Sequence, residues 1–177
     1  MTLESFYQKI LNPPEPWIVS EVKLSELGPC VNVWLTHEKH PFRCPECNQE
    51  APIYDHMPER VLQHLDTCGR ETCLHVKLPR VKCPVHGVKM VAFPLAGPNQ
   101  DVTHDLERKC IQATIASSQA DIARLFGLTY GRLEGIMTRA LHRGAFITGE
   151  KIRRTAPVPP HSLWNRERDQ LRLNFIL

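Results

Sequence analysis

Two short motifs constrain this chain more than any other feature of its sequence. Cys44 and Cys47 lie in the run CPEC, and Cys83 and His86 lie in the run CPVH. Two intervening residues let both side chains of a motif turn toward one point about 2.0–2.3 Å away, where Zn²⁺ would be held. Four such ligands fill a tetrahedral site and leave no position for water. We therefore predict one structural Zn²⁺ per chain and no catalytic residues at this site.

The remaining cysteines and histidines fit a metal site less well. Cys68 and Cys73 are alternative ligands, but a predicted turn lies in the four-residue gap between them, and Cys30 and Cys110 are expected to be ordinary thiols. The run HEKH at 37–40 lacks the i, i+4 histidines of a zinc protease helix. The HxE and PCxxC signature of a deaminase is missing as well. A redox role for Cys44 and Cys47 would require a helix N-terminus after a strand, which Pro45 and the polar run after Cys47 do not indicate.

The sequence before and around these motifs predicts a short helix and several strands. Residues 3–11 place apolar side chains at Leu3, Phe6, Ile10 and Leu11, and prolines follow at 13 and 14, which predicts an amphipathic helix. Strands are expected over 17–24 and 31–35, and again over 61–65 and 72–82 with a turn at Cys68 and Gly69. We expect the second strand pair to form a zinc ribbon with the two motifs. Residues 93–100 contain two prolines and a glycine and are expected to be a linker.

Beyond the linker the apolar period changes to that of helices, which are expected over 103–117, 119–126 and 130–143. Ser118 and Thr129 are suited to cap the second and third of these helices. Small Ala123, Gly127 four residues later, and the apolar Leu133 and Ile136 have the spacing of a helix-turn-helix. In that motif the second helix enters the major groove of DNA.

This interpretation nominates a set of DNA-contacting residues. The net charge of +3 permits a polyanionic partner without requiring one. Arginine suits guanine or phosphate, and hydroxyl groups suit phosphate or base edges. The alternative is a three-helix bundle whose charged face is only solvated. The nominated residues are Thr129, Tyr130, Arg132, Glu134, Thr138, Arg139 and Arg143 on the third helix and Lys151, Arg153 and Arg154 beyond it.

Taken together, these segments resemble the N-terminal half of the ISL-three family of bacterial insertion-sequence transposases. The resemblance runs from about residue 42 to 144 and includes FRCPEC, YDHMPERVLQHLD, PRVKCPVHG, FPLAGP and the helix-turn-helix. It implies recognition of the terminal inverted repeats of a transposon by double-stranded DNA binding. It also implies a full-length transposase, or a second copy in a dimer, as a further partner.

The sequence departs from that family after the helix-turn-helix. The family's RNase H-like catalytic domain needs more than about 100 residues to bring three carboxylates around two Mg²⁺ ions. Only residues 145–177 follow the motif here, and their acids, Glu150, Glu167 and Asp169, lie among arginines and prolines. We therefore expect a truncated transposase without catalysis. The alternatives are the recognition subunit of a split transposase and a zinc-ribbon module that binds protein.

The predicted fold class is α+β, with a small zinc-ribbon β domain followed by a three-helix helix-turn-helix domain. The expected divisions are 1–41 (helix and strands), 42–92 (zinc ribbon), 93–102 (linker), 103–144 (helix-turn-helix) and 145–177 (basic, proline-containing tail). No apolar run is long enough to cross a bilayer, and the N-terminus lacks the layout of a signal peptide. A cytoplasmic protein without a membrane partner is expected, and the resemblance places it at the bacterial nucleoid.

Overall fold

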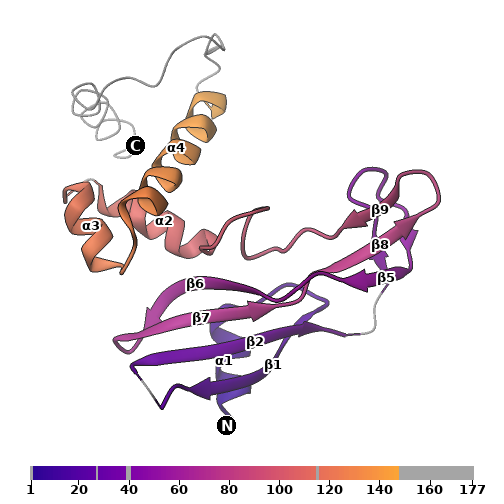
Figure 1. The fold of residues 1–177 in the computed structure, drawn as a ribbon, viewed down its shortest axis with the longest axis horizontal. Coiled ribbons are helices and arrows are strands. Elements are labelled where there is room, and N and C mark those ends of the chain that lie inside the picture. Colours follow the sequence, from indigo (N-terminus) through magenta and orange to yellow (C-terminus); the bar gives the residue numbers. More distant parts are fainter. Residues whose placement is uncertain (1, 27, 39–40, 115, 148–177) are drawn as a thin grey trace. The chain divides into compact units, whose positions relative to one another are not determined.

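The computed structural model describes residues 2–26, 28–38, 41–114 and 116–147 (Figure 1). The chain divides into two compact units, Met1–Leu106 and Glu107–Leu177. The first unit holds one whole helix, all the named strands and the first residues of α2. The regular structure described in the second unit is helical and consists of the rest of α2 and two further helices. The predicted α+β class is confirmed, with four helices among the described residues.

Helix α1 (Leu3–Leu11) has the predicted bounds but buries a different face from the one expected. The side chain of Thr2 accepts a hydrogen bond from the Ser5 amide at its start, and Asn12 ends it with a φ of 39°. Tyr7 and Leu11 are the buried residues. The predicted apolar side chains of Leu3, Phe6 and Ile10 are instead exposed. The buried face of α1 therefore includes the ring of Tyr7, which the apolar pattern of the sequence had not included.

A four-stranded sheet forms the body of the first unit. It contains β1 (Trp17–Leu24), β2 (Cys30–His37), β6 (Arg60–Thr67) and β7 (Arg70–Val76) in the order β1-β2-β7-β6. The β2–β7 pair is parallel, and the other two pairs are antiparallel. Alternate side chains of these strands, such as Val33, Leu62 and Leu74, are fully buried in one core with Tyr7 and Leu11 of α1.

The hairpin β6–β7 is confirmed, but its place differs from the expectation. Its turn lies at Cys68 and Gly69, which both have positive φ values, of 53° and 73°, as a tight two-residue hairpin turn requires. The hairpin pairs with β2 instead of with the strands around the cysteine motifs. The single strand expected over 72–82 is also divided in two, because Pro79 has no amide proton to continue the ladder and starts a new strand.

Two small sheets carry the cysteine motifs (Figure 1). One pairs β3 (Phe42–Arg43) with β4 (Glu50–Ala51). The other contains β5 (Ile53–His56), β8 (Pro79–Cys83) and β9 (Gly87–Met90) in the order β5-β8-β9. Each motif therefore lies in the turn of an antiparallel hairpin, between β3 and β4 or between β8 and β9.

The segment expected to be a linker is packed into the first unit. Phe93 is 5% exposed, and its ring centroid lies 5.0 Å from that of Trp17. Farther along, the Gln63 amide donates to the Asp101 carbonyl, and the Thr103 amide donates to the Gln63 carbonyl. Proline and glycine predicted a break in regular structure correctly. They did not reveal that Phe93 is buried against Trp17, or that the backbone farther along pairs with the edge strand β6.

Three helices follow: α2 (His104–Ala113), α3 (Gln119–Leu125) and α4 (Tyr130–Ile147). The Ser118 side chain accepts a hydrogen bond from the Asp121 amide at 3.3 Å and caps α3 as predicted. The Thr129 side chain accepts a 3.4 Å hydrogen bond from the Arg132 amide at the start of α4. Helix α2 is shorter than expected, and α4 is longer by one turn.

Candidate metal centre and nucleic-acid interface

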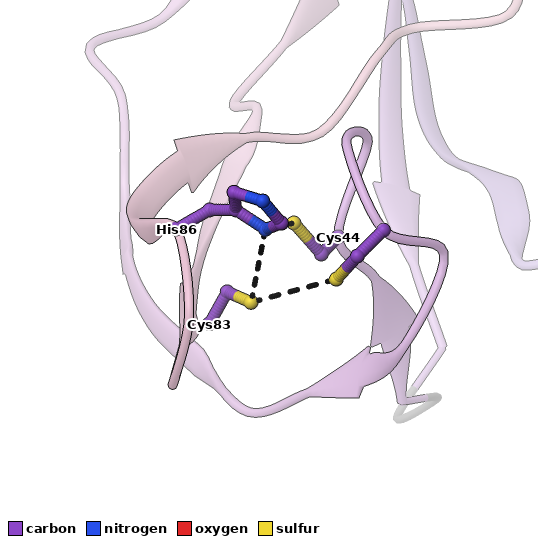
Figure 2. A group of neighbouring side chains, drawn as sticks. Cys44, Cys83 and His86 are labelled. Atoms are coloured by element: carbon purple, nitrogen blue, oxygen red, sulfur yellow. Dashed lines mark hydrogen bonds between the residues drawn. The ribbon is translucent and has the colours of Figure 1, made fainter.

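The two cysteine motifs, far apart in sequence, bring their side chains to one point. The ligand atoms of Cys44, Cys47, Cys83 and His86 all lie within 4.8 Å of one another, and both Cys44 and Cys83 are buried. Figure 2 shows the imidazole of His86 directed toward the sulfurs of Cys44 and Cys83. All the cysteines of the cluster are free thiols. The structure therefore places the four predicted ligands in one cluster.

The spacing of these atoms fits a tetrahedral metal ion. Bonds of about 2.3 Å to sulfur and about 2.05 Å to nitrogen place tetrahedral ligand atoms about 3.8 Å apart for two sulfurs and about 3.5 Å apart for sulfur and nitrogen. The Sγ atoms of Cys47 and Cys83 are 3.6 Å apart. The Nδ1 atom of His86 is 3.7 Å from the Sγ of Cys44 and 3.7 Å from the Sγ of Cys83. Three thiols and one imidazole are also one of the donor sets that bind Zn²⁺ in structural sites.

In both turns, backbone amides lower the pKa of the first cysteine of the motif. The backbone amide of Cys47, with that of Glu46, points at the Cys44 sulfur and lowers the pKa of this thiol. The backbone amides of His86 and Val85 lower the pKa of Cys83 in the same manner. Because the thiolate is the form that binds metal, amide donors directed at sulfur prepare both residues for coordination.

An acidic side chain and a basic one lie beside the Nε2 side of the His86 ring, away from the sulfurs. Its Nε2 atom lies 3.6 Å from a carboxylate oxygen of Glu46, and the other oxygen of Glu46 lies 2.5 Å from the Lys89 amine. This lysine is the main cause of the lowered pKa of Glu46. A carboxylate beside Nε2 favours the proton on that nitrogen and leaves Nδ1 free to face the sulfurs.

The alternative ligands lie elsewhere. Cys68 is exposed in the β6–β7 turn, and Cys73 lies with its Sγ 3.8 Å from that of Cys30 on the neighbouring strand β2. Among the described residues the Cys44, Cys47, Cys83 and His86 group is the one cluster of three or more such side chains close enough to share an ion. Cys110 is fully buried, and burial, followed by the charge of Glu107, raises the pKa of its thiol to about 11.

Helices α3 and α4 are joined by a short turn with positive backbone φ at one residue. Gly127 has a φ of 60°, and the Leu128 amide donates to the Ala123 carbonyl at 2.8 Å. Ala123 is 8% exposed, and Leu133 and Ile136 are fully buried, in agreement with their predicted role in packing. The Tyr130 hydroxyl also donates to the Gln119 side chain at 3.1 Å, which connects the first turns of the two helices.

The predicted DNA contacts do not lie on one face of α4. Thr129, Tyr130, Glu134 and Thr138 are exposed, whereas Arg132 and Arg139 are half-buried. At about 100° per residue, Glu134 and Thr138 lie about 40° and 80° around the helix from Tyr130. The three arginines 132, 139 and 143 lie at about 180–220°. The arginines therefore occupy a different side of α4 from the exposed hydroxyl and carboxylate groups.

Two of these arginines form ion pairs with a residue that the sequence pattern did not indicate. Glu107 of α2 is 2% exposed, and its two carboxylate oxygens lie 2.9 Å from Arg139 Nε and 3.0 Å from an Arg143 guanidinium nitrogen. The sequence feature that could have indicated the burial of Glu107 is its position directly beside Leu106 and three residues before Cys110, on the apolar stripe of the predicted helix. Lys151, Arg153 and Arg154 lie outside the described residues.

Comparison with known proteins agrees with this geometry. Residues 40–86 match a family model described as the zinc-finger of transposase IS204/IS1001/IS1096/IS1165. Residues 91–141 match the helix-turn-helix domain of transposase family ISL3. Two consecutive segments of the chain are thus similar to DNA-binding regions of transposases. More particularly, they are similar to the zinc ribbon and the helix-turn-helix domain of the ISL3 transposase family.

Two curated relatives extend the comparison. The chain is 29% identical over 98 residues to the transposase for insertion sequence element IS1557 from two strains of Mycobacterium tuberculosis, CDC 1551 / Oshkosh and H37Rv. The aligned part is 55% of this chain and 22% of each relative, so the chain spans about a fifth of their length. No solved structure matches. Within the described residues no helix is both long and apolar enough to span a membrane.

Proposed function

We propose that this chain is a zinc-stabilised, sequence-specific DNA-binding protein that recognises the terminal inverted repeats of an insertion sequence and does not itself cleave DNA. One observation carries the proposal: a Cys₃His cluster with tetrahedral spacing and a helix-turn-helix occur in the order in which one transposase family has them. Double-stranded DNA is the proposed partner, and a second copy or a full-length transposase would pair the two ends.

In this proposal Zn²⁺ has a structural role. Cys44 and Cys47 would hold it from the β3–β4 turn, and Cys83 and His86 from the β8–β9 turn. Four protein ligands leave no open position, so the ion would supply a cross-link between two hairpins that are too short to be stable alone. One ion per chain is expected.

DNA would be read by the exposed side of α4. The first turn presents Thr129 and Tyr130, and the next turns present Glu134 and Thr138. Hydroxyl groups at a helix N-terminus suit phosphate contacts, and the positive end of the helix dipole adds to this attraction. Arg132 is half-buried about 60° around the helix from Thr129, and its guanidinium group is proposed to reach guanine or a phosphate beside the first turn.

The proposal is tested by gel shift with the full chain, using a duplex from the ends of the element that encodes it and a scrambled duplex. Specific binding that weakens steeply with salt is expected, because each phosphate contact contributes about 0.9 to the slope of log K against log salt. Arg132→Ala should weaken specific binding more than non-specific binding, with Arg70→Ala on β7 as the matched exposed control. No shift, or equal shifts of both duplexes, would refute sequence-specific recognition.

The metal and the expected absence of cleavage have separate measurements. Purified protein should contain one zinc per chain, and Cys83→Ala should lose both the zinc and the ribbon fold. Zinc retained in that variant would contradict the ligand assignment. Incubation of an end-labelled duplex with the chain and Mg²⁺ should leave the strands intact, and nicking that depends on the chain would overturn the non-catalytic part of the proposal.

A further inference from the structure

The buried carboxylate of Glu107 joins α2 to α4 within the second unit. Its side chain is 3% exposed, whereas those of Arg139 and Arg143 are 35% and 50% exposed. One oxygen faces Arg139 Nε at 2.9 Å and the other faces Arg143 at 3.0 Å. Arg139 and Arg143 are four residues apart, so they project from consecutive turns of α4 on the same side.

Moving either arginine away from this carboxylate costs free energy. A carboxylate that is removed from water is tolerated when cationic hydrogen-bond donors surround it, and it becomes strongly unfavourable when they are taken away. If both arginines turned toward DNA phosphates, Glu107 would remain buried with its charge no longer compensated by them. The ion pairs therefore favour a conformation in which the guanidinium groups stay against α2.

The backbone of α4 is adapted to this arrangement. Gly135 lies one turn before Arg139, and a Cβ atom at this position would lie 3.3 Å from an Arg139 guanidinium nitrogen. That distance is tighter than an ordinary van der Waals contact, so a side chain here would force the guanidinium group to shift. The missing side chain leaves room for Arg139 to lie along the helix as it reaches Glu107.

We propose that Glu107 is a positioning residue for DNA recognition: it holds Arg139 and Arg143 against α2, so that these arginines fix the orientation of α4 and do not contact DNA phosphates. The inference rests on the DNA binding proposed above. It removes two cations from the phosphate-contacting set that the sequence suggests, and it leaves Tyr130, Glu134 and Thr138 as the side of α4 that faces DNA.

Salt dependence separates positioning from phosphate contact. The full chain is titrated with a duplex of arbitrary sequence of about 30 base pairs over a salt series, since the electrostatic contribution does not depend on sequence. Arg139→Gln and Arg143→Gln should leave the slope of log K against log salt within about 0.3 of the parent, well below the value of about 0.9 for one lost phosphate contact. A decrease of about 0.9 in either variant overturns the proposal.

The link between Glu107 and α4 is measured by thermal unfolding. Glu107→Gln and Arg143→Gln should each lower the midpoint, and the double variant should be no less stable than Glu107→Gln alone, because both changes break the same contact. Additive losses overturn the proposal. If Glu107→Gln does not fold, the salt series with Arg139→Gln and Arg143→Gln still decides the proposal, because both variants keep Glu107.

Failure of this inference is distinguishable from failure of the proposed function. A parent protein that binds no duplex at any salt concentration refutes the DNA-binding function, and with it the role assigned to Glu107 in recognition. A parent that binds, with a slope that falls in Arg143→Gln, leaves the function intact and refutes only the positioning role.

Discussion

One of the interactions that hold residues 93–103 in place within the first unit is a buried side-chain hydrogen bond that can be removed almost without change of shape. Thr103 is 1% exposed and His64 is 9% exposed, and the Thr103 hydroxyl lies 2.8 Å from His64 Nδ1. The hydroxyl oxygen also accepts a long, 3.4 Å hydrogen bond from the Leu106 amide in the first turn of α2. Which of the Thr103 hydroxyl and His64 Nδ1 donates the proton depends on the tautomer of the imidazole.

Replacing this threonine by valine keeps the branched shape and removes both interactions. A buried donor or acceptor left without its partner costs about 1–3 kcal/mol, and a lost helix cap costs about 0.5–2 kcal/mol, with the long distance here favouring the low end. We expect Thr103→Val to lower the free energy of unfolding of the first unit by about 2–3 kcal/mol. With a urea dependence of about 1–3 kcal/mol per molar, the unfolding midpoint should fall by roughly 0.7–3 M.

The assay is urea unfolding followed by tryptophan fluorescence in a Trp164→Phe background, so that the signal comes from Trp17 and Trp34 in the first unit. Thr36→Val, at an exposed position of β2, is the matched control and should change stability by less than about 0.5 kcal/mol. If Thr103→Val behaved like this control, the hydrogen bond would contribute nothing to the docking of the segment, and the reasoning would be refuted.

Three further predictions concern His64 and two residues of the second unit. Burial, opposed in part by the charge of Asp105, lowers the pKa of His64, so in acid the unfolded chain binds a proton that the folded chain does not. The free energy of unfolding should therefore fall as the pH drops below about 6.5, by at most about 1.4 kcal/mol per pH unit. His64→Gln should reduce this dependence in urea titrations at several pH values. Ser118→Ala removes the cap of α3 and should lower the stability of the second unit by about 1 kcal/mol in thermal unfolding followed by circular dichroism, and an unchanged midpoint would contradict the capping assignment. Gly127→Ala places a side chain at a φ of 60° and should cost about 1–2 kcal/mol in the same measurement, whereas Gly131→Ala, in a helical turn with open space around it, should be neutral or stabilising.

Local spacing explains what could be predicted from the sequence. The two-residue gap in each cysteine motif fixes the reach of its side chains, so the pairing of Cys44 with Cys47 and of Cys83 with His86 follows from the chain itself. Capping by Ser118 and Thr129 is likewise a contact between residues three positions apart. Such features depend little on the rest of the fold.

The parts that were not predicted depend on distant residues. Nothing in the run 61–76 says that β7 will lie parallel to β2, because this pairing depends on which edge the hairpin β1–β2 leaves open. Phe93 and Ala96 looked like linker residues because proline and glycine dominated the pattern, although both are buried. Glu107 escaped notice because its partners, Arg139 and Arg143, follow it by more than 30 positions.

The parallel pairing of β2 with β7 has a practical consequence for dissecting this protein. The zinc-finger match begins at residue 40, after β2 has ended, and the helix-turn-helix match begins at residue 91. A fragment cut at the first boundary would keep β6 and β7 but remove the strand that completes their sheet, exposing a row of unpaired backbone groups along β7. Such a fragment is expected to aggregate even with its metal ligands intact, so the smallest soluble piece containing the ribbon should start before Trp17 and extend past Thr103.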